Sequence, residues 1–421
     1  MEQAYWLLNV RLEDGYEYTE GTVTKTITNL YNVLIKNDKI SEIIKADEPI
    51  KDEYIQINAA MLLALPPFAE KHYHLDKSYY GGEWKSAKPV KNLLERLEDE
   101  ASILPHQIGA VKSTARLLIN KIMEAGSTHI RTHVNIDPYV GLKNLEMVRD
   151  VLEEYQDRLT YEIVAFPQHG LLRTNVSGLM QEAMTLGATH VGGLDPAGVD
   201  RNMERSLAEM MDIAVKSDAD IDIHLHDPDY LGAYTINKLL NLTEDAGWQN
   251  RVAVSHGFGL GGVTLPEAES IADRMAANGV SLISTVPIKA SRTIPPLQAL
   301  RARGVHVALG CDSMFDWWGP FGNANIVDRL SQYAEYSNWC DERTLAESLG
   351  FITGGITPLN ADGKKVWPQI GDEASFVLAE ASCSAELIAR RSRIHGVVHK
   401  GKLQVKEGIS HDYNLETSQN G

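Results

Sequence analysis

The middle of the chain alternates short apolar runs with longer amphipathic stretches. Eight runs have the length and composition of buried strands: 62–69, 129–136, 161–166, 190–194, 221–225, 251–256, 280–286 and 305–310. Between them, apolar residues recur at helical spacing in segments such as 108–125, 142–155, 203–216, 233–246 and 265–278. This alternation predicts repeated strand–helix units, and eight such units are what a (β/α)8 barrel of the TIM type requires.

A doubly wound open sheet is the main alternative to the barrel. Such a sheet usually carries a glycine-rich turn after its first strand, because phosphate groups approach the backbone there. No GxGxxG or GxxxxGK[ST] pattern follows any of the eight runs. The pattern therefore favours the barrel.

The two ends of the chain have a different pattern from the middle. Short alternating runs, such as 21–27 and 31–35, are separated by turn residues over positions 1–60, and similar runs return over 373–410. We interpret both ends as strands of one small β-sandwich domain. The predicted domains are a composite of 1–61 with 361–421, and a barrel over 62–360.

Polar side chains gather where the predicted barrel strands end, which is where barrel enzymes place their chemistry. The strand ends contain His72, His74, Asp76, Lys77, His133, Gln168, His169, Asp195, His224, His226, Asp227, Ser255, His256, Asp312 and Ser313.

Four of these side chains are suited to a metal ion. Alternation along a strand puts His72 and His74 on one face, so both imidazoles can point into the mouth of the barrel. His224 and Asp312, from two other strands, can complete the site. Three neutral nitrogens and one carboxylate oxygen suit one divalent ion per chain, Zn²⁺ or Fe²⁺, with a position left for water. A metal bound in this way lowers the pKa of that water toward ~7.

Each signal has a plainer explanation when it is taken alone. The chain has 14 histidines, so an HxH pair arises easily by chance. A single histidine at a strand end is more often a hydrogen-bonded structural residue than a ligand. The metal site is favoured because several independent strand ends offer ligands together.

Composition limits the class of protein. Of the 421 residues, 43% are hydrophobic and 23% are charged, as is ordinary for a globular protein. A net charge of −17 would repel a nucleic-acid polymer, although it does not exclude a small neutral ring. Three cysteines without CxxC spacing, no leader-like start and no long apolar run favour a cytoplasmic protein without a disulfide framework or a membrane span.

Several segments resemble the amidohydrolase superfamily, in its cytosine deaminase-like branch. The run PPFAEKHYHLDK at 66–77 is similar to the first-strand signature of that superfamily, and VAFPQ at 164–168 fits the branch. GGLDPA at 192–197 and DIHLHDP at 222–228 are closer to triazine-degrading members of the superfamily.

The resemblance implies roles for individual residues. It implies a mononuclear centre held by His72, His74, His224 and Asp312, because the lysine that binuclear relatives carry at the end of the fourth strand is missing. Asp312 would also accept a proton, and His256 would polarise the substrate or its tetrahedral intermediate.

Substrate-binding roles are implied for Lys77, Gln168 and Asp195. Alternatives remain open, since Lys77 could be a surface lysine and Asp195 could cap a helix. A flat ring needs an apolar wall, so we expect Trp317 or its neighbour Trp318 to face the substrate.

The chain departs from cytosine deaminases at two positions. Those enzymes carry a glutamate where this chain has Asp227, and a second aspartate after the metal aspartate where it has Ser313. Both positions would contact the ring, so cytosine is expected to be a poor substrate.

His226 and Asp227 compete for the role of proton shuttle. Alternation from His224 puts His226 on the inward face, whereas a strand that has already become a loop can turn Asp227 inward. Asp227 is one methylene shorter than glutamate, and an imidazole transfers protons readily near neutral pH. We expect His226 to be the shuttle, with Asp227 orienting it or binding the amine.

Together these features predict a metal-dependent hydrolase that removes an amine from a ring carbon of a pyrimidine, triazine, pterin or similar heterocycle. Its relatives are homo-oligomers, which favours a homo-oligomer here. One alternative is a ring-opening hydrolase of cyclic amides, which the missing fourth-strand lysine disfavours. Another is a barrel that binds a heterocycle without turnover, which would require a broken ligand position, and none is visible.

Overall fold

The structure is a computed structural model that describes residues 4–51, 53–289 and 292–405. The chain divides into two compact units. One comprises Met1–Phe68, Met123–Thr128 and Leu330–Gly421, and the other comprises Ala69–Ile122 and His129–Arg329. The predicted domain limits at 61 and 361 stay a prediction.

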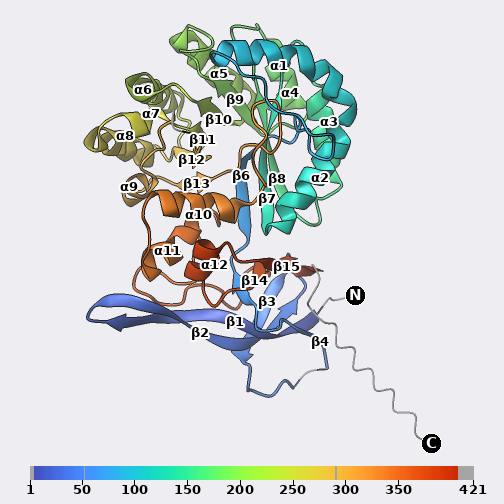
Figure 1. Ribbon diagram of the computed structural model, residues 1–421, viewed down its shortest axis with the longest axis vertical. Coiled ribbons are helices and arrows are strands. Elements are labelled where there is room, and N and C mark those ends of the chain that lie inside the picture. The colour runs from blue at the N-terminus through green and yellow to red at the C-terminus, as the bar shows by residue number, and fades with distance from the viewer. Residues whose placement is uncertain (1–3, 52, 290–291, 406–421) are drawn as a thin grey trace, which may run out of the picture. The chain divides into compact units, whose positions relative to one another are not determined.

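The first unit is built on a sheet to which both ends of the chain contribute strands (Figure 1). These strands are β1 (Ala4–Thr19), β2 (Thr22–Lys36), β3 (Lys39–Lys45), β4 (Ile55–Asn58), β5 (Leu63–Leu65), β14 (Phe376–Ala379), β15 (Ile394–His399) and β16 (Lys402–Val405). Hydrogen bonds give the order β16-β15-β14-β5-β1-β2-β3, with β4 paired to β1. The predicted runs 21–27 and 31–35 lie within the single strand β2.

One hydrophobic cluster fills this unit. It joins Leu12 of β1, Val33 of β2, Phe376 of β14 and Val398 of β15, all of them buried. Because β2 and β15 are not neighbours in the sheet, the sheet must curve for their side chains to share one core. Burying each such side chain contributes about 1.5–3 kcal/mol. The predicted β-domain made from both chain ends is confirmed.

The second unit contains an eight-stranded parallel sheet in the order β13-β12-β11-β10-β9-β8-β7-β6. The strands are β6 (Phe68–Tyr73), β7 (Ser127–Asn135), β8 (Thr160–Phe166), β9 (His190–Leu194), β10 (Asp220–Leu225), β11 (Val252–His256), β12 (Ser281–Ser284) and β13 (Val307–Leu309). Their side chains are buried nearly throughout, as parallel strands covered on both faces require.

The first and last strands close the barrel through a parallel bridge between Tyr73 and Asp312. The backbone N–H of Asp312 donates to the carbonyl of His72 at 2.9 Å, and the N–H of His74 donates to the carbonyl of Asp312 at 2.9 Å. A Cβ atom on Gly310 would lie 2.4 Å from the Cβ of His72, so only glycine permits this close approach.

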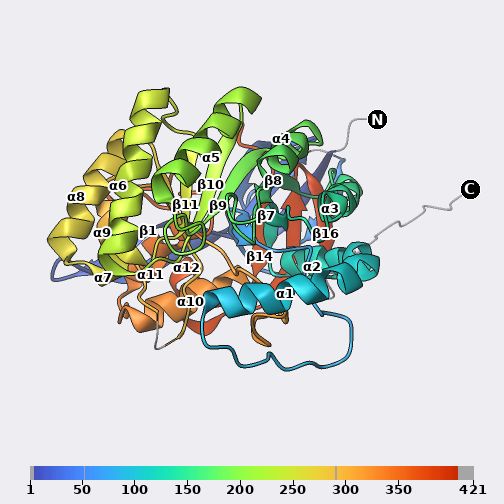
Figure 2. The ribbon, with the colours of Figure 1, turned by 90° about the horizontal axis from the view of Figure 1, so that it is seen from above.

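The described helices are α1 (Leu93–Gln107), α2 (Val111–Glu124), α3 (Lys143–Glu153), α4 (Ser177–Thr185), α5 (Met203–Ser217), α6 (Asp229–Ala246), α7 (Gly259–Gly262), α8 (Leu265–Ala277), α9 (Leu297–Ala302), α10 (Ile326–Tyr336), α11 (Glu342–Ser348) and α12 (Ser384–Arg390). Figure 2 shows α2 to α6 and α8 around the outside of the barrel strands. None of the helices in the described ranges is long and apolar enough to cross a membrane.

Helix α8 illustrates how the sequence determines where a helix begins and which of its faces is buried. Thr264 and Glu267 form a capping box that satisfies free N–H groups at the start of the helix. Ala268, Ile271, Ala272 and Met275 then recur at the spacing of one helical face, and all four are buried.

The predicted barrel is confirmed, with one shift in its first strand. The predicted run 62–69 is divided between β5, which pairs in the sheet of the first unit, and β6, the first barrel strand. Pro66 and Pro67 lie between the two strands, where the missing N–H groups interrupt a ladder of hydrogen bonds. The five predicted helices correspond to α2, α3, α5, α6 and α8.

Candidate metal centre

Three of the distances between the predicted metal ligands are those expected around one ion. The Nε2 atoms of His74 and His224 are 3.3 Å apart. Oδ1 of Asp312 lies 3.6 Å from Nε2 of His74 and 3.7 Å from Nε2 of His72. Ligand atoms in a tetrahedron around zinc are about 3.4 Å from one another, so these distances match one divalent ion.

The protonation of these histidines also fits a cation. The Nδ1 of His74 lies 3.1 Å from the carbonyl oxygen of His133 and can only donate to it, which leaves a lone pair on Nε2. The Nε2 of His72 has no hydrogen-bond partner in the described structure although this side chain is fully buried. Burial lowers the pKa of His72, His74 and His224 below the ordinary value, and a neutral imidazole is the form that binds metal.

Two further buried histidines border the same space. Ligand atoms of His133 lie within 4.8 Å of those of His72 and His224, and His256 forms a similar group with His72 and Asp312. Neither ring nitrogen of His133 has a hydrogen-bond partner among the described residues. The sequence predicted no direct role for His133, yet its ring centroid lies 4.1 Å from that of His72.

Three of the predicted site residues have a left-handed backbone. The φ angles are 36° at Asp195, 68° at His256 and 67° at Asp312. This region is unfavourable for side chains other than glycine, and such strain gathers at functional sites. Each of the three residues lies at the end of a barrel strand, where the turn re-aims its side chain.

A carboxylate orients the predicted shuttle His226. The Nδ1 of His226 lies 2.9 Å from Oδ2 of Asp195, and Oδ1 of Asp195 accepts from the backbone N–H of both His226 and Asp227. Because an ionised carboxylate only accepts, Nδ1 of His226 carries the proton and Nε2 is free to act as a base. The ring centroid of His226 lies 4.2 Å from that of His256, which in turn borders the candidate ligands His72 and Asp312.

Asp227 points elsewhere than the sequence suggested. Its carboxylate accepts from the backbone N–H groups of Gly198 and Ala197, whereas Nδ1 of His226 is hydrogen-bonded to Asp195. Burial, and then the nearby charge of Asp195, raises the pKa of Asp227 to about 6. Asp195 therefore occupies the orienting position that the sequence assigned to Asp227.

A buried lysine lies next to the candidate metal centre. The Nζ of Lys77 donates to Oε1 of Gln168 at 2.6 Å and lies 3.5 Å from Oε1 of Glu100. It also lies 5.9 Å from the ring of Phe166, which itself stacks on His224 with centroids 3.9 Å apart. Burial alone would lower the pKa of Lys77, but neighbouring carboxylates, Glu100 foremost, outweigh it and raise the pKa.

Glu100 is buried although it belongs to an acidic cluster at 95–100. Such a cluster ordinarily forms a solvated helix face. Glu100 is instead only 1% exposed, and it accepts from the indole N–H of Trp318 at 2.8 Å. Glu100 lies on the same face of α1 as Leu97 and Leu104, which are also buried.

The two tryptophans and Ser313 take different places. Trp318 packs with Phe166 and lies 5.5 Å from Nζ of Lys77, while Trp317 lies over the guanidinium of Arg96. The tryptophan beside Lys77 is therefore Trp318. The hydroxyl of Ser313 is hydrogen-bonded to the carboxyl of Asp316, whose pKa burial raises to about 6.

Comparisons with known proteins identify the family of the chain. The family model described as "Amidohydrolase family" matches residues 56–405, most of the chain. The chain therefore belongs to the amidohydrolase family.

Three similar proteins illustrate the range of the family. An uncharacterised protein of Escherichia coli K12, YahJ, is 38% identical over 402 residues, which cover 95% of this chain and 87% of that protein. The crystal structure of N-isopropylammelide isopropylaminohydrolase from Burkholderia multivorans is 29% identical with a TM-score of 0.82, covering 95% of this chain and 98% of the other. The structure of 5-methylcytosine deaminase from Klebsiella pneumoniae shares the fold at 22% identity, with a TM-score of 0.75. The match covers 97% of this chain and 99% of the other.

The buried position of Glu100 predicts a large effect on stability. Glu100→Ala removes a carboxylate partner of a buried ammonium, which we expect to destabilise the protein by about 3 kcal/mol. The matched control is Glu98→Ala on the same helix, where the carboxylate is mostly exposed and pairs with Arg173 at 3.3 Å. That change should cost about 1 kcal/mol or less. Urea denaturation followed by circular dichroism would measure both; equal losses would contradict the burial of Glu100.

Proposed function

We propose that this protein is a metal-dependent hydrolase that removes an amino or substituted amino group from a ring carbon of a nitrogen heterocycle. The observation that carries the proposal is the short distance from Nε2 of His74 to both His224 and Asp312, together with a histidine base oriented by Asp195. The name of the B. multivorans relative, an aminohydrolase of a substituted triazine, supports the reaction class.

The ligand set defines what the ion would contribute. His72, His74, His224 and Asp312 would hold one zinc or iron ion, which supplies a Lewis acid and an activated water when it is bound. The water oxygen forms a bond to the ring carbon, the bond from that carbon to the exocyclic nitrogen breaks, and one water proton leaves with the amine.

His226 would carry that proton. Its Nε2 has the free lone pair because Nδ1 donates to Asp195, so it can accept a proton from the attacking water. The same nitrogen then returns the proton to the departing amine. His256, whose Nε2 has no partner among the described residues, would polarise the ring atom next to the reacting carbon.

The substrate would lie against Lys77 and its partners. Phe166 and Trp318 supply apolar walls for a flat ring, and Lys77 supplies a cationic donor for a ring oxygen or nitrogen. The amide of Gln168, held by Lys77, would contact the ring edge. Assembly into homo-oligomers and a cytoplasmic location stay predictions from the sequence.

The first prediction of this proposal concerns metal content. The purified protein should carry one zinc or iron ion per chain, measured by elemental analysis. His72→Ala and Asp312→Ala should each lose the metal and at least about a thousandfold in kcat, while circular dichroism shows an intact fold. His133→Gln is the matched control and should keep the metal. Two ions per chain, with activity that follows the second, would contradict a mononuclear centre.

A second prediction concerns specificity. Asp227 stands where cytosine deaminases carry a glutamate, and Ser313, where they carry a second aspartate, is hydrogen-bonded to Asp316. Amine release should therefore be faster from amino- or alkylamino-substituted rings than from cytosine. The measurement is kcat/KM over a panel of pyrimidines, pterins and triazines. A kcat/KM for cytosine of ~10⁶ M⁻¹s⁻¹ or above would contradict this expectation.

A third prediction assigns the proton shuttle. His226→Asn should lower kcat by two or more decades with the metal retained, because the free Nε2 base is lost. Asp227→Asn is the matched control on the adjacent residue and should have a smaller effect on kcat. Single-turnover kinetics with metal analysis would measure both variants. A normal kcat in His226→Asn, together with a loss of two decades in Asp227→Asn, would reverse the assignment.

A further inference from the structure

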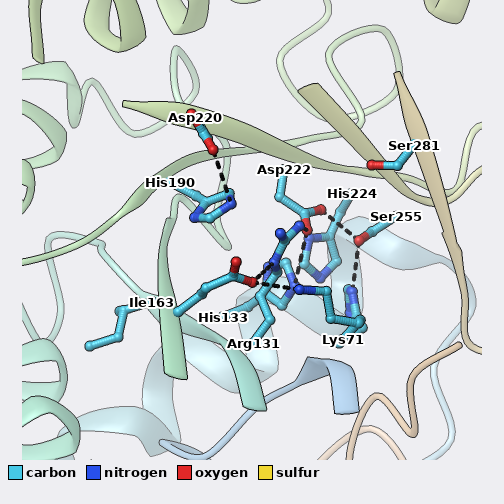
Figure 3. Close-up of polar contacts among 12 residues, drawn as sticks. Lys71, Arg131, His133, Ile163, His190, Asp220, Asp222, His224, Ser255 and Ser281 are labelled. Carbon is cyan, nitrogen blue, oxygen red and sulfur yellow. Dashed lines mark hydrogen bonds and ion pairs between the residues drawn. The ribbon is translucent and has the colours of Figure 1, made fainter. Parts of the chain in front are cut away.

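A chain of buried polar side chains lies one layer below the candidate metal centre, inside the barrel (Figure 3). Asp222 precedes His224 by two residues on β10, so alternation puts both on the inward face, with Asp222 deeper. The Nδ1 of His72 lies 2.8 Å from Oγ of Ser255, and that hydroxyl donates to Oδ1 of Asp222 at 2.6 Å. All three side chains are fully buried.

This chain determines which nitrogen of His72 carries the proton. An ionised carboxylate only accepts, so the single hydroxyl proton of Ser255 is committed to Asp222. The Oγ of Ser255 must then accept from His72, which fixes the proton on Nδ1 and leaves the lone pair on Nε2. Nε2 is the atom that lies 3.7 Å from Asp312.

The carboxylate of Asp222 at the end of the chain is paired with the guanidinium of Arg131. Nη1 of Arg131 donates to Oδ2 of Asp222 at 2.8 Å, and Nε of Arg131 donates to Glu162 at 2.6 Å. Lys71 donates to the same oxygen of Glu162 at 2.9 Å, so two cations balance two carboxylates. Burial would lower the pKa of Arg131, but Asp222 and Glu162 outweigh it and raise the pKa.

We propose that Ser255 and Asp222 are positioning residues for the metal: they hold His72 in the tautomer that presents Nε2 and make that nitrogen a stronger ligand. Neither residue was predicted to have a role in metal binding. Partners of this kind behind a histidine ligand typically change metal affinity by about 10- to 100-fold. This inference rests on the proposed metal centre.

The first measurement is metal affinity, obtained by competition between the apo-protein and a chromophoric chelator for Zn²⁺. Ser255→Ala and Asp222→Asn should each weaken zinc binding by about 10- to 100-fold. The matched control is Ser284→Ala, which truncates another fully buried serine on the neighbouring strand β12. Ser284→Ala should leave the zinc affinity unchanged, and Ser255→Thr, which restores a hydroxyl, should recover it.

A spectroscopic measurement separates positioning from packing. In the protein loaded with Co²⁺, the Nδ1 proton of His72 should give a shifted, exchangeable NMR resonance. Ser255→Ala should move that resonance and speed its exchange with solvent, and Ser255→Thr should restore it. Asp222→Asn keeps the side-chain shape and carries the same test should Ser255→Ala not fold.

The outcomes distinguish this inference from the proposed function. Wild-type protein that binds no Zn²⁺ would overturn the metal centre itself. Wild-type protein that binds Zn²⁺, with Ser255→Ala and Asp222→Asn at equal affinity and an unchanged His72 resonance, would overturn only the positioning role. A loss of affinity that Ser284→Ala reproduces would also overturn it, since any buried truncation would then have the same effect.

Discussion

The first and last strands of the barrel are joined by two backbone hydrogen bonds, and both involve Asp312. Its N–H donates to the carbonyl of His72 and its carbonyl accepts from the N–H of His74. The interaction that closes the barrel therefore also fixes three candidate ligands relative to one another. Gly310 is part of the same constraint, because any larger residue would push the last strand away from His72. A change that opened this seam would be expected to separate the ligands before it unfolded the barrel.

The second constraint is that polar groups buried in the barrel must be paired, and the pairing decides which atoms are left for chemistry. Asp195 holds the proton of His226 on Nδ1, and Ser255 does the same for His72. In both histidines the lone pair is left on Nε2. Lys77 stays charged in a buried position because Glu100 and other carboxylates surround it. The protonation states at this site thus follow from contacts made behind the side chains.

Much of this arrangement could be predicted from the sequence, because barrel enzymes concentrate functional polar residues at strand ends. The alternation of side chains along a strand also shows which residues point into the barrel. His72, His74, His224 and Asp312 were proposed as ligands in this way, and the structure places Nε2 of His74 near His224 and Asp312. The burial of Glu100 was missed because its acidic neighbours favour a solvated face, although it shares one face of α1 with Leu97 and Leu104. The division of the first predicted strand was missed because its apolar run continues across two prolines.

The hydrogen-bond partners of buried polar side chains could not be predicted from the sequence either. Asp195 and Asp227 are both acidic residues at strand ends, and only the left-handed backbone at Asp195 and the turn at Gly198 determine which one meets His226. Choosing Trp318 over Trp317 likewise needed the position of Phe166. Such choices depend on contacts between segments far apart in the chain, which periodicity does not report.

The position of the ion is the central question, because His133 forms a competing set of metal ligands with His72 and His224. Anomalous diffraction from crystals of the metal-loaded protein, recorded on both sides of the absorption edge of the metal, would locate the ion directly. A mononuclear centre predicts one anomalous peak per chain. That peak should lie about 2.0–2.2 Å from Nε2 of His72, His74 and His224 and from a carboxylate oxygen of Asp312. A peak coordinated by His133 in place of His74 and Asp312, or two peaks in one chain, would contradict it.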